Sequence, residues 1–328
     1  MARTLRRPLV ASMLLAVGAT LSMAAARAES ADTFPSKPIT IIVNFGAGGP
    51  TDLPPRRIAA YLEKKFKQPV VVENRTGGAG VVGLSAVARA APDGYTLGTF
   101  SASPTVIAPR LRTVPYNARK DFTPVAQIAE YAMPLCVLPT RPWKSVADLM
   151  AHARANPGAV TYSTVGTGSG QHIFMEALAK AEKVKLAHVP FSGGAGGIAA
   201  LLGGHVQGAL DAALAKHAAT GECRALASVG SARHPALPDV PTFKELGYTI
   251  DAALWLGLAG PAGMPQAIVD KLSAAILEAT EDPSYKDLLK QLLLGDKTAG
   301  SAAFRAQVAA DDERMAAMMN DLGMTAPK

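Results

Sequence analysis

Four glycine-rich segments carry the residue types and spacing that could bind a ligand. Each follows a short run of strand-forming residues and precedes a segment with helical spacing. Glycine in such a turn lets the backbone approach a ligand, and the following helix offers free N–H groups and the positive end of its dipole. The predicted chemistry is therefore binding of an anion by backbone amides, without a basic side chain. The four segments are residues 45–52, 77–80, 166–170 and 192–197.

One of these segments also matches a nucleotide-binding pattern. Gly78-x-Gly80-x-x-Gly83 lies between a predicted strand and a predicted helix, as the dinucleotide fingerprint requires. However, the next predicted strand ends at Phe100-Ser101 without the acidic residue that would hold a ribose. We therefore favour a tight structural turn here and keep a nucleotide-dependent oxidoreductase as the alternative class of protein.

Catalytic and metal-binding patterns are weak elsewhere. Ser169 is directly preceded by Gly168, so the nucleophile-elbow pattern G-x-S-x-G is not met. His172 falls in the first turn of a predicted helix, where it either contacts a ligand or caps the turn, and Asp211 ends a predicted strand, where it either faces a cleft or caps the next turn. His188 lies in a predicted strand, which favours a core or edge position. No two of the six histidines have H-x-x-x-H spacing, so we expect no metal site.

Composition bounds the class of protein. The chain has 328 residues, of which 49% are hydrophobic and 18% are charged. This predicts roughly two domains with packed cores and excludes a largely disordered or collagen-like chain. Of the formal net charge of +7, four units come from arginines in residues 1–28, which hold no acidic residue. The remainder is too small for a nucleic-acid surface, so we expect no nucleic-acid partner.

The first 28 residues have the composition of a secretory signal peptide. Arginines form a charged start, an apolar stretch follows, and Ala26-Arg27-Ala28 matches an A-x-A cleavage site. We expect cleavage after Ala28 and export to a bacterial periplasm, with an uncleaved membrane anchor as the alternative. Because the periplasm is oxidising, Cys136 and Cys223 could form a disulfide, a point that the sequence leaves open.

Strand and helix patterns alternate along the mature chain. Short β-branched runs suit buried parallel strands, and the segments between them have helical spacing. Ser145 and Asp148 match a capping box, and Pro265 and Pro283 occupy first-turn positions, where a missing N–H costs little. The predicted strands are 39–43, 70–73, 95–100, 134–139, 160–164, 186–190, 206–210, 223–229 and 254–259. The predicted helices are 53–65, 81–90, 145–156, 172–183, 194–202, 265–279, 283–293 and 301–322.

The order of these elements predicts two α/β lobes. The second α/β unit looks inserted into the first, and the C-terminal helices return to the first. We predict a first lobe formed by residues 34–134 and 255–328, and a second lobe formed by residues 135–254. Two crossings of the chain between the lobes would make a hinge, and a hinged pair of lobes has a cleft for a ligand.

Nine segments, which include the glycine-rich ones, are together typical of one protein family. In chain order they are FPSKPITIIVNFGAGGPTD, VVVENRTGGAG, APDGYTLGTF, VPYNARKDFTPVAQIA, YSTVGTGSGQHI, AHVPFSGG, ALLGGHVQGAL, RALASVGSARHPALPDVPTFKELG and GLAGPAGMP. With them the chain resembles, from Phe34 to nearly the C-terminus, the Bug family (TctC-type) of periplasmic solute-binding proteins. These are the receptor components of tripartite tricarboxylate transporters.

The resemblance implies a type II-like periplasmic binding protein with a hinge and an interlobe ligand cleft, with no catalysis and no cofactor. The ligand would be a small organic carboxylate, bound by backbone N–H groups of residues 48–52 and 166–172. The implied ligand-binding residues are Phe45, Gly48, Gly49, Thr51, Asp52, Ser101, Ser103, Gly166, Thr167, Gly168, Ser169, His172, Phe191, Gly193, Gly194 and Asp211.

The resemblance also implies partners. The loaded receptor, a monomer, would dock on a two-subunit membrane permease. A sensor that passes the ligand signal to a membrane kinase would share the fold and the cleft, and it stays an alternative. The sequence does not name the ligand, so dicarboxylates, tricarboxylates, acidic amino acids and aromatic carboxylates all stay open.

The chain departs from the family pattern near residues 48–52, the first of the two turns whose backbone N–H groups would bind the ligand. Pro54 and Pro55 stand in the first turn of the predicted helix and, with Pro50, remove N–H donors from the end that would face the anion. We hypothesise that the second loop contributes more to binding, or that the ligand is less charged. The amides expected to remain as donors are those of Gly48, Gly49, Thr51, Asp52 and Leu53.

Overall fold

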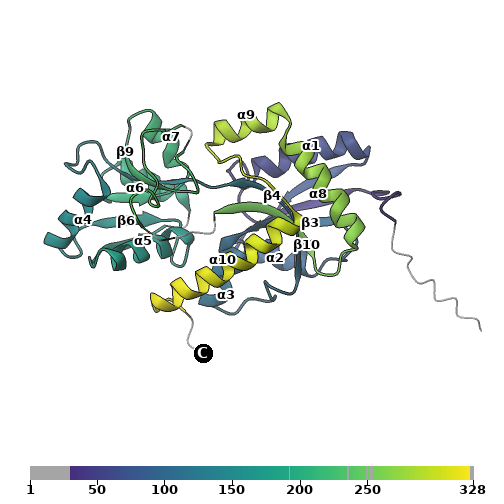
Figure 1. The fold of residues 1–328 in the computed structure, drawn as a ribbon, viewed down its shortest axis with the longest axis horizontal. Helices are drawn as coiled ribbons and strands as arrows, with labels where there is room; N and C mark the ends of the chain where they lie inside the picture. The colour runs from purple at the N-terminus through teal and green to yellow at the C-terminus, as the bar shows by residue number, and fades with distance from the viewer. Residues whose placement is uncertain (1–29, 192, 235, 249, 251–253, 326–328) are drawn as a thin grey trace, which may run out of the picture.

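The computed structural model describes residues 30–191, 193–234, 236–248, 250 and 254–325. The predicted signal peptide, with its cleavage after Ala28, and Ser192 of the fourth glycine-rich segment lie outside these residues. The described strands form two sheets, and Figure 1 shows two α/β lobes side by side. The predicted α/β class is confirmed.

The first lobe is built on a mixed six-stranded sheet. Its strand order is β11-β4-β10-β3-β1-β2. β1 pairs in parallel with β2 and β3, whereas β10 runs antiparallel to β3 and β4. The strands are β1 (Ile39–Val43), β2 (Val70–Asn74), β3 (Thr96–Ser101), β4 (Phe122–Glu130), β10 (Trp255–Pro261) and β11 (Ala299–Gly300).

Helices cover both faces of this sheet. Ile58 of α1 and Leu272 of α8 belong to the apolar cluster on one face, and Leu84 of α2 and Phe304 of α10 to the cluster on the other. Within the described residues, no helix combines the length and apolar composition that a bilayer span requires. The helices are α1 (Leu53–Phe66), α2 (Val81–Ala88), α3 (Ala108–Leu111), α8 (Gln266–Thr280), α9 (Pro283–Leu292) and α10 (Ser301–Asp321), with the short helices η1 (Gly78–Gly80) and η2 (Ser103–Ile107, a π-helix).

The sequence pattern does not predict β4. Pro124 and Gln127 interrupt its apolar run, although Gln127 is fully buried. Pro124 has no N–H to donate, and the pairing of β4 with β10 shifts register between Leu258 and Ala259, beside it. Pairing with both β10 and β11 therefore outweighs the poor local pattern of this strand.

The second lobe is built on a five-stranded sheet with the order β7-β6-β8-β5-β9. β6 pairs in parallel with β7 and β8, and β5 runs antiparallel to β8 and β9. The capping box predicted at Ser145 and Asp148 is confirmed at the start of α4. The elements are β5 (Met133–Val137), β6 (Thr161–Thr164), β7 (Ala187–Pro190), β8 (Gly208–Leu210), β9 (Arg224–Val229), α4 (Val146–Ala155), α5 (Gly170–Ala181), α6 (Gly194–Leu202) and α7 (Leu214–Ala219).

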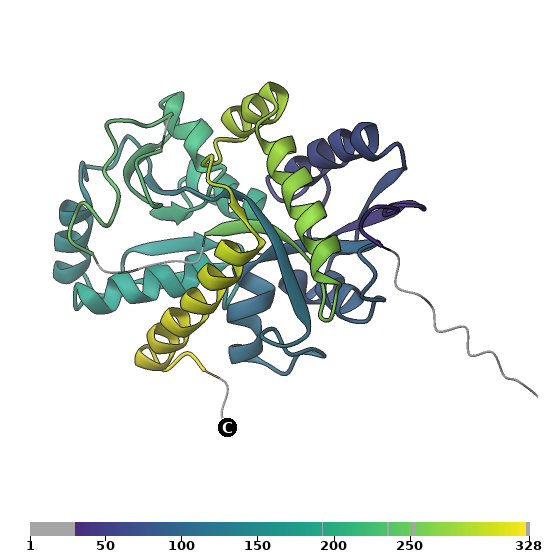
Figure 2. The same ribbon diagram turned by 45° about the vertical axis from the view of Figure 1, so that its right-hand side comes forward.

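The chain passes between the two sheets twice. Residues 131–132 join β4 to β5, and residues 230–254 lead from β9 to β10. The crossings lie together, because the amide of Tyr131 donates to the carbonyl of Leu254 at 2.7 Å. The end of α10 also reaches α5, where Lys180 Nζ lies 2.6 Å from Asp321 Oδ1 (Figure 2). The exact residue limits of the two lobes stay a prediction.

Both cysteines lie in the second lobe. Cys136 and Cys223 are free thiols, and both belong to one buried apolar cluster. Burial raises the pKa of Cys136, which keeps this thiol protonated and unreactive. The sequence left open whether these two cysteines form a disulfide, and in the structure both are thiols.

Candidate functional site

The first glycine-rich turn, residues 45–52, connects β1 to α1 and is called loop A. Its shape depends on Asp52, whose side chain is only 1% exposed. The carboxylate accepts the Gly48 amide at 2.8 Å and two bonds from Arg56 Nε at 2.9 and 3.0 Å. Asn74 at the end of β2 donates to the same carboxylate at 2.8 Å and to the carbonyl of Phe45 at 2.9 Å. This network ties both ends of loop A to the sheet.

The charge of Asp52 is stabilised where it lies. Burial alone would raise the pKa of its carboxyl, but the hydrogen bonds from Arg56, Gly48 and Asn74 outweigh burial and hold that pKa below its usual value. Because its oxygens already accept these donors, the Asp52 side chain braces the loop. Its predicted contact with a ligand stays a prediction.

Most of the amides expected as donors in loop A have acceptors inside the protein. The Gly48 amide donates to Asp52, and the amides of Asp52 and Leu53 both donate to the carbonyl of Gly49, at 3.0 and 3.1 Å. Among the expected donors, the amides of Gly49 and Thr51 have no protein acceptor in the described part of the chain. Loop A therefore offers fewer free donors than the sequence suggested.

The second turn, residues 166–172, connects β6 to α5 and is called loop B. Ser169 caps α5 by accepting the His172 amide at 3.3 Å, and the Ser169 amide donates to the carbonyl of Gly166 at 3.2 Å. The Gly168 amide donates to Nδ1 of His172 at 3.1 Å, which places the proton of a neutral ring on Nε2. Across the described residues, the amides of Thr167, Gly170 and Gln171 have no protein acceptor.

His172 is stacked against His188 of β7. The ring centroids are 3.9 Å apart and the planes differ by 17°, while Nε2 of His188 lies 2.7 Å from Oγ1 of Thr164. Burial lowers the pKa of both rings, and the neighbouring His172 contributes to a pKa of about 4 for His188. Both rings are therefore neutral near pH 7, and the stack supports loop B from the neighbouring strand.

The ends of three parallel strands converge beside loop B. β6, β7 and β8 are neighbours and parallel, so loop B, the turn after β7 and Asp211 lie at one edge of the sheet. Asp211 accepts the Ala213 amide at 2.9 Å and Nε2 of Gln171 at 3.3 Å. A Cβ on Gly194 would lie 3.0 Å from Asp211 Oδ2. Asp211 therefore caps its own turn and also lies at the start of α6.

The turn after β7 is closely packed around Phe191. A Cβ on Gly196 would lie 3.0 Å from its ring, and a Cβ on Gly166 would lie 3.5 Å from its carbonyl oxygen. A Cβ on Gly193 would meet nothing within 4 Å. The start of α6 is thus open at Gly193 and filled by Phe191 one turn later.

Loop B also contacts the first lobe. Gly168 has a φ of +75°, and a Cβ there would overlap Cδ1 of Leu111 in α3. A Cβ on Gly170 would lie 3.8 Å from Ile107 in η2, and Ile173 of α5 joins an apolar cluster otherwise built from the first lobe. The segment η2–α3 is therefore the surface of the first lobe on which loop B packs.

The serines predicted from the resemblance lie at the start of that same segment. The hydroxyl of Ser101 is buried and has no hydrogen-bond partner in the described structure. Ser103 Oγ donates weakly to the carbonyl of Ala79 at 3.4 Å. A buried hydroxyl without a partner costs free energy, so Ser101 is a group that a ligand or a water could satisfy.

The nucleotide-like pattern is explained by packing. A Cβ on Gly80 would come within 3.2 Å of Pro104 and 3.3 Å of the Phe45 ring. A Cβ on Gly83 would lie 2.7 Å from the Arg75 carbonyl oxygen. Glycine is required at both positions because other protein atoms fill the space, which favours the structural turn over a phosphate-binding loop.

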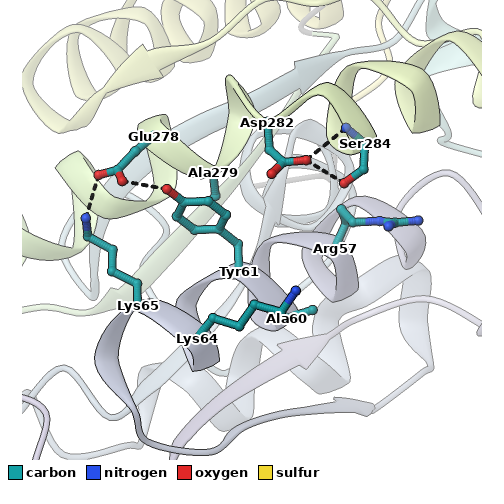
Figure 3. Close-up of a pocket in the computed structure, with 9 residues that line it drawn as sticks. All are labelled: Arg57, Ala60, Tyr61, Lys64, Lys65, Glu278, Ala279, Asp282 and Ser284. Atoms are coloured by element: carbon teal, nitrogen blue, oxygen red, sulfur yellow. Dashed lines mark hydrogen bonds and ion pairs between the residues drawn. The ribbon is translucent and has the colours of Figure 1, made fainter.

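Three cavities lie elsewhere on the molecule. Figure 3 shows one of about 410 Å³ where α1 meets α8 and α9, with Tyr61 and Lys65 both bonded to Glu278. A second of about 440 Å³ lies between residues 228–231, residues 243–248 and α10, and a third of about 300 Å³ lies between η2, β4 and α10. None of the three is lined by loop A, loop B or Asp211. No group of three or more metal-ligating side chains is found among the residues searched, namely the described ones.

Several residues that shape the site were not predicted as part of it. Arg56 had a signal, because its spacing of four from Asp52 places the two on one helix face. Leu111 and Tyr131 had none, because their contacts depend on how distant segments meet. The backbone of Gln171 falls in the predicted range 166–172, but its side-chain bond to Asp211 was not predicted. Tyr131, in the first crossing, has its hydroxyl 2.6 Å from Oγ1 of Thr51 in loop A.

Comparison with known sequences gives one consistent picture. The family model described as "Tripartite tricarboxylate transporter family receptor" matches residues 55–324. A protein from the gbd 5′ region of Cupriavidus necator is 37% identical over 278 residues, covering 84% of this chain and 85% of that protein. BugT of Bordetella pertussis is 34% identical over 275 residues, covering 82% and 84%.

Comparison with solved structures agrees. A protein of R. palustris solved with adipate has a TM-score of 0.80 and 29% identity, covering 89% of this chain and 99% of that one. MatC of Rhodopseudomonas palustris with bound malate has a TM-score of 0.72 and 30% identity, covering 88% and 98%. The periplasmic binding protein BugD has a TM-score of 0.77 and 28% identity, covering 89% and 99%.

Proposed function

The chain belongs to the tripartite tricarboxylate transporter receptor family, and from this premise we propose that it captures a small organic carboxylate between its two lobes and delivers it to a membrane transporter. Members of the family are solute-binding receptors of the periplasm. Two structurally similar proteins were solved with malate and with adipate. The proposal carries this ligand class, though no single ligand, over to the present chain.

The observation that carries the proposal is a set of backbone amides without acceptors in two glycine-rich turns. Among the amides expected as donors, those without an acceptor within the described residues belong to Gly49 and Thr51 in loop A and to Thr167, Gly170 and Gln171 in loop B. A charge-assisted hydrogen bond contributes about 1.5–3 kcal/mol in favourable cases, and each helix N-terminus adds roughly 0.3–1 kcal/mol. A few such contacts support micromolar binding, which corresponds to about −8 kcal/mol.

The ligand would enter when the lobes separate. Leu111 fills the space against Gly168, so the contact between loop B and η2–α3 blocks access from that side. The proposed lobes are residues 34–134 with 255–328, and residues 135–254, and they would rotate about the two crossings. Closure over the ligand would exclude water and strengthen the amide–carboxylate contacts.

The proposed site surrounds the ligand carboxylate that loops A and B would hold. Its further residues are Phe45, Ser101 and Ser103 in the first lobe and Phe191, Gly193, Gly194 and Asp211 in the second. The unpartnered hydroxyl of Ser101 is the side chain most in need of a ligand or water. Loop A also holds the amides of Phe45, Gly46 and Ala47, which have no protein acceptor among the described residues, so its prolines and internal bonds do not leave it with fewer free amides than loop B. The hypothesis that loop B contributes more to binding stays a prediction.

The remaining parts of the proposal follow from the family and the sequence. The protein would be exported after cleavage at Ala28, act as a monomer and dock on a two-subunit permease without catalysing a reaction. A sensor role with a membrane kinase shares the same site and differs only in the partner. A nucleotide-dependent oxidoreductase is disfavoured, because Phe45 and Pro104 occupy the space beside Gly80.

A thermal-shift screen of the mature protein tests the ligand class. Malate, adipate, citrate and glutamate are compared with glucose and with a nicotinamide cofactor. A ligand at 100 times its Kd stabilises a protein by about 2.7 kcal/mol, so at least one carboxylate should raise Tm by several degrees. A response to glucose or to the cofactor, with none to any acid, would contradict the proposal.

A further inference from the structure

Tyr131 is held by both lobes at the first crossing. Its side chain packs against the main apolar cluster of the first lobe and also against that of the second. Its amide donates to the carbonyl of Leu254, which belongs to the other crossing, at 2.7 Å. The position of this ring therefore depends on how the two lobes are oriented.

The hydroxyl of Tyr131 also reaches loop A. It lies 2.6 Å from Oγ1 of Thr51, whose own amide is one of the two expected donors in loop A that have no protein acceptor in the described chain. Burial raises the pKa of Tyr131 to about 12, partly offset by the bond to Thr51, so the hydroxyl stays protonated in the physiological range. The bond thus joins a proposed ligand-binding residue to the crossing.

We propose that Tyr131 is a positioning residue that couples loop A to the orientation of the lobes. When the lobes rotate about the crossings, the ring moves with respect to loop A and the bond to Thr51 changes. The Thr51 amide would then be aimed correctly in one orientation of the lobes only. By reciprocity, a ligand bound at this amide favours the same orientation. The inference rests on the proposed function and adds a mechanism for coupling binding to closure.

The test uses variants that remove this bond from either end. Tyr131→Phe removes only the ring hydroxyl, and Thr51→Val removes the other hydroxyl of the bond while keeping the branched shape and the amide. Tyr61→Phe is the matched control, because its hydroxyl bonds to Glu278 at 2.5 Å on the outer face of the first lobe. Two exposed positions, Lys64 in α1 and Ala151 in α4, are changed to cysteine and labelled to report the distance between lobes. The native cysteines are both buried.

Two measurements without ligand decide the matter. Hydrogen exchange at the neighbouring amides of Asp52 and Leu53, which donate to the carbonyl of Gly49, should speed up about three- to tenfold in Tyr131→Phe. The interlobe distance distribution should widen or shift in both Tyr131→Phe and Thr51→Val. Tyr61→Phe should match the parent protein in both measurements. An unchanged distance distribution in both variants, with faster exchange alone, would mean a merely local bond and would overturn the proposal.

Binding of malate separates this inference from the proposed function. If malate binds the parent protein, its Kd should rise about three- to tenfold in both variants, and the double variant should show no further rise. An additive rise in the double variant would contradict a single shared bond. If no carboxylate binds, the proposed function fails, whereas the ligand-free distances still report on the coupling.

Discussion

At the scale of single residues, the glycine-rich turns are defined as much by bracing side chains as by the glycines. Asp52 is buried and accepts bonds from Gly48, Arg56 and Asn74, and Ser169 and His172 hold the corresponding positions in loop B. These bonds fix which amides are free. Backbone amides positioned in this way can receive an anion with little rearrangement, which lowers the entropic cost of binding.

A methyl group added at Gly49 should lower carboxylate affinity if the free amides of loop A contact the ligand. The Cβ added by Gly49→Ala would lie 4.0 Å from the carbonyl oxygen of Gly46, so the fold tolerates it while the methyl crowds a ligand at this turn. We expect a loss of carboxylate affinity of about tenfold or more, equivalent to roughly 1.4 kcal/mol. Titration calorimetry with the best acid from the screen measures it.

Gly46→Ala is the matched control for this prediction. A Cβ at Gly46 also meets nothing within 4 Å, in the same loop, but the Gly46 amide is not among the proposed donors. Its affinity should stay within about twofold of the parent protein. Equal losses in the two variants would mean that loop A is generally sensitive and that Gly49 has no special role.

The histidine stack gives a pH dependence with a defined sign. Because the pKa of His188 is lowered to about 4, the unfolded chain binds a proton near pH 6.5 that the folded protein does not. Stability from this group is therefore complete above pH 6.5 and falls as the pH drops towards 4. His188→Phe keeps a ring for stacking and removes this proton.

Denaturant unfolding at pH 7 and at pH 5 measures the effect. The parent protein should lose about 1 kcal/mol more than His188→Phe between these pH values, a figure already reduced for partial exposure of the ring. His172 and His234 also have lowered pKa values, so the difference between the two proteins is the relevant quantity. A larger loss of unfolding free energy between pH 7 and pH 5 in His188→Phe than in the parent protein would contradict this prediction.

At the scale of elements, the contact between loop B and α3 is the point where the lobes meet at the site. Gly168 combines a φ of +75° with a Leu111 methyl in the way of any Cβ. Gly168→Ala should therefore cost about 1–2 kcal/mol for the left-handed backbone and a further amount for the clash. Adding Leu111→Ala to the Gly168→Ala variant should restore only the part of the unfolding free energy that the clash had cost.

Unfolding free energies of the two single variants and the double variant check this. A double variant more stable than Gly168→Ala alone, though less stable than Leu111→Ala, is the expected order. If the effects simply add, the two side chains do not meet in solution, and the lobes adopt another orientation there.

Most elements were predicted from the sequence because their signals are local. The β-branched run of β1, the capping box of α4 and the glycine-rich start of α6 all act within a few residues. β4 was missed because Pro124 and Gln127 hide a strand that distant partners bury. The π-helix η2 and the Tyr131–Thr51 bond were missed because they form only when the sheet and the crossing are in place.

The same distinction applies to the candidate site. The sequence predicted glycine-rich turns before helices, and these turns occur at the carboxyl ends of β1 and β6. It overestimated the free donors of loop A, because it could not show that Asp52 and the carbonyl of Gly49 occupy three of the five amides. Hydrogen bonds within a turn depend on its three-dimensional shape, which spacing alone does not give.

At the scale of the whole molecule, two α/β lobes joined by two adjacent crossings bring glycine-rich turns from both lobes near the same segment, η2–α3. Loop B packs on this segment directly, while the Phe45 ring of loop A lies next to Gly80, beside Pro104 of η2. The long helix α10 spans the first sheet and touches α5 of the second lobe through Lys180 and Asp321. Binding between the lobes is therefore expected to change their relative orientation, as in hinge-closing proteins.

The central claim is that amides of loops A and B together hold a carboxylate. A crystal structure of the mature protein, grown with the acid that raises Tm most, tests it directly. The account predicts one carboxylate within hydrogen-bond distance of Gly49 or Thr51 on one side and of Thr167, Gly170 or Gln171 on the other. A ligand held in the cavity between α1, α8 and α9, or bound to one lobe with the two loops facing apart, would contradict it.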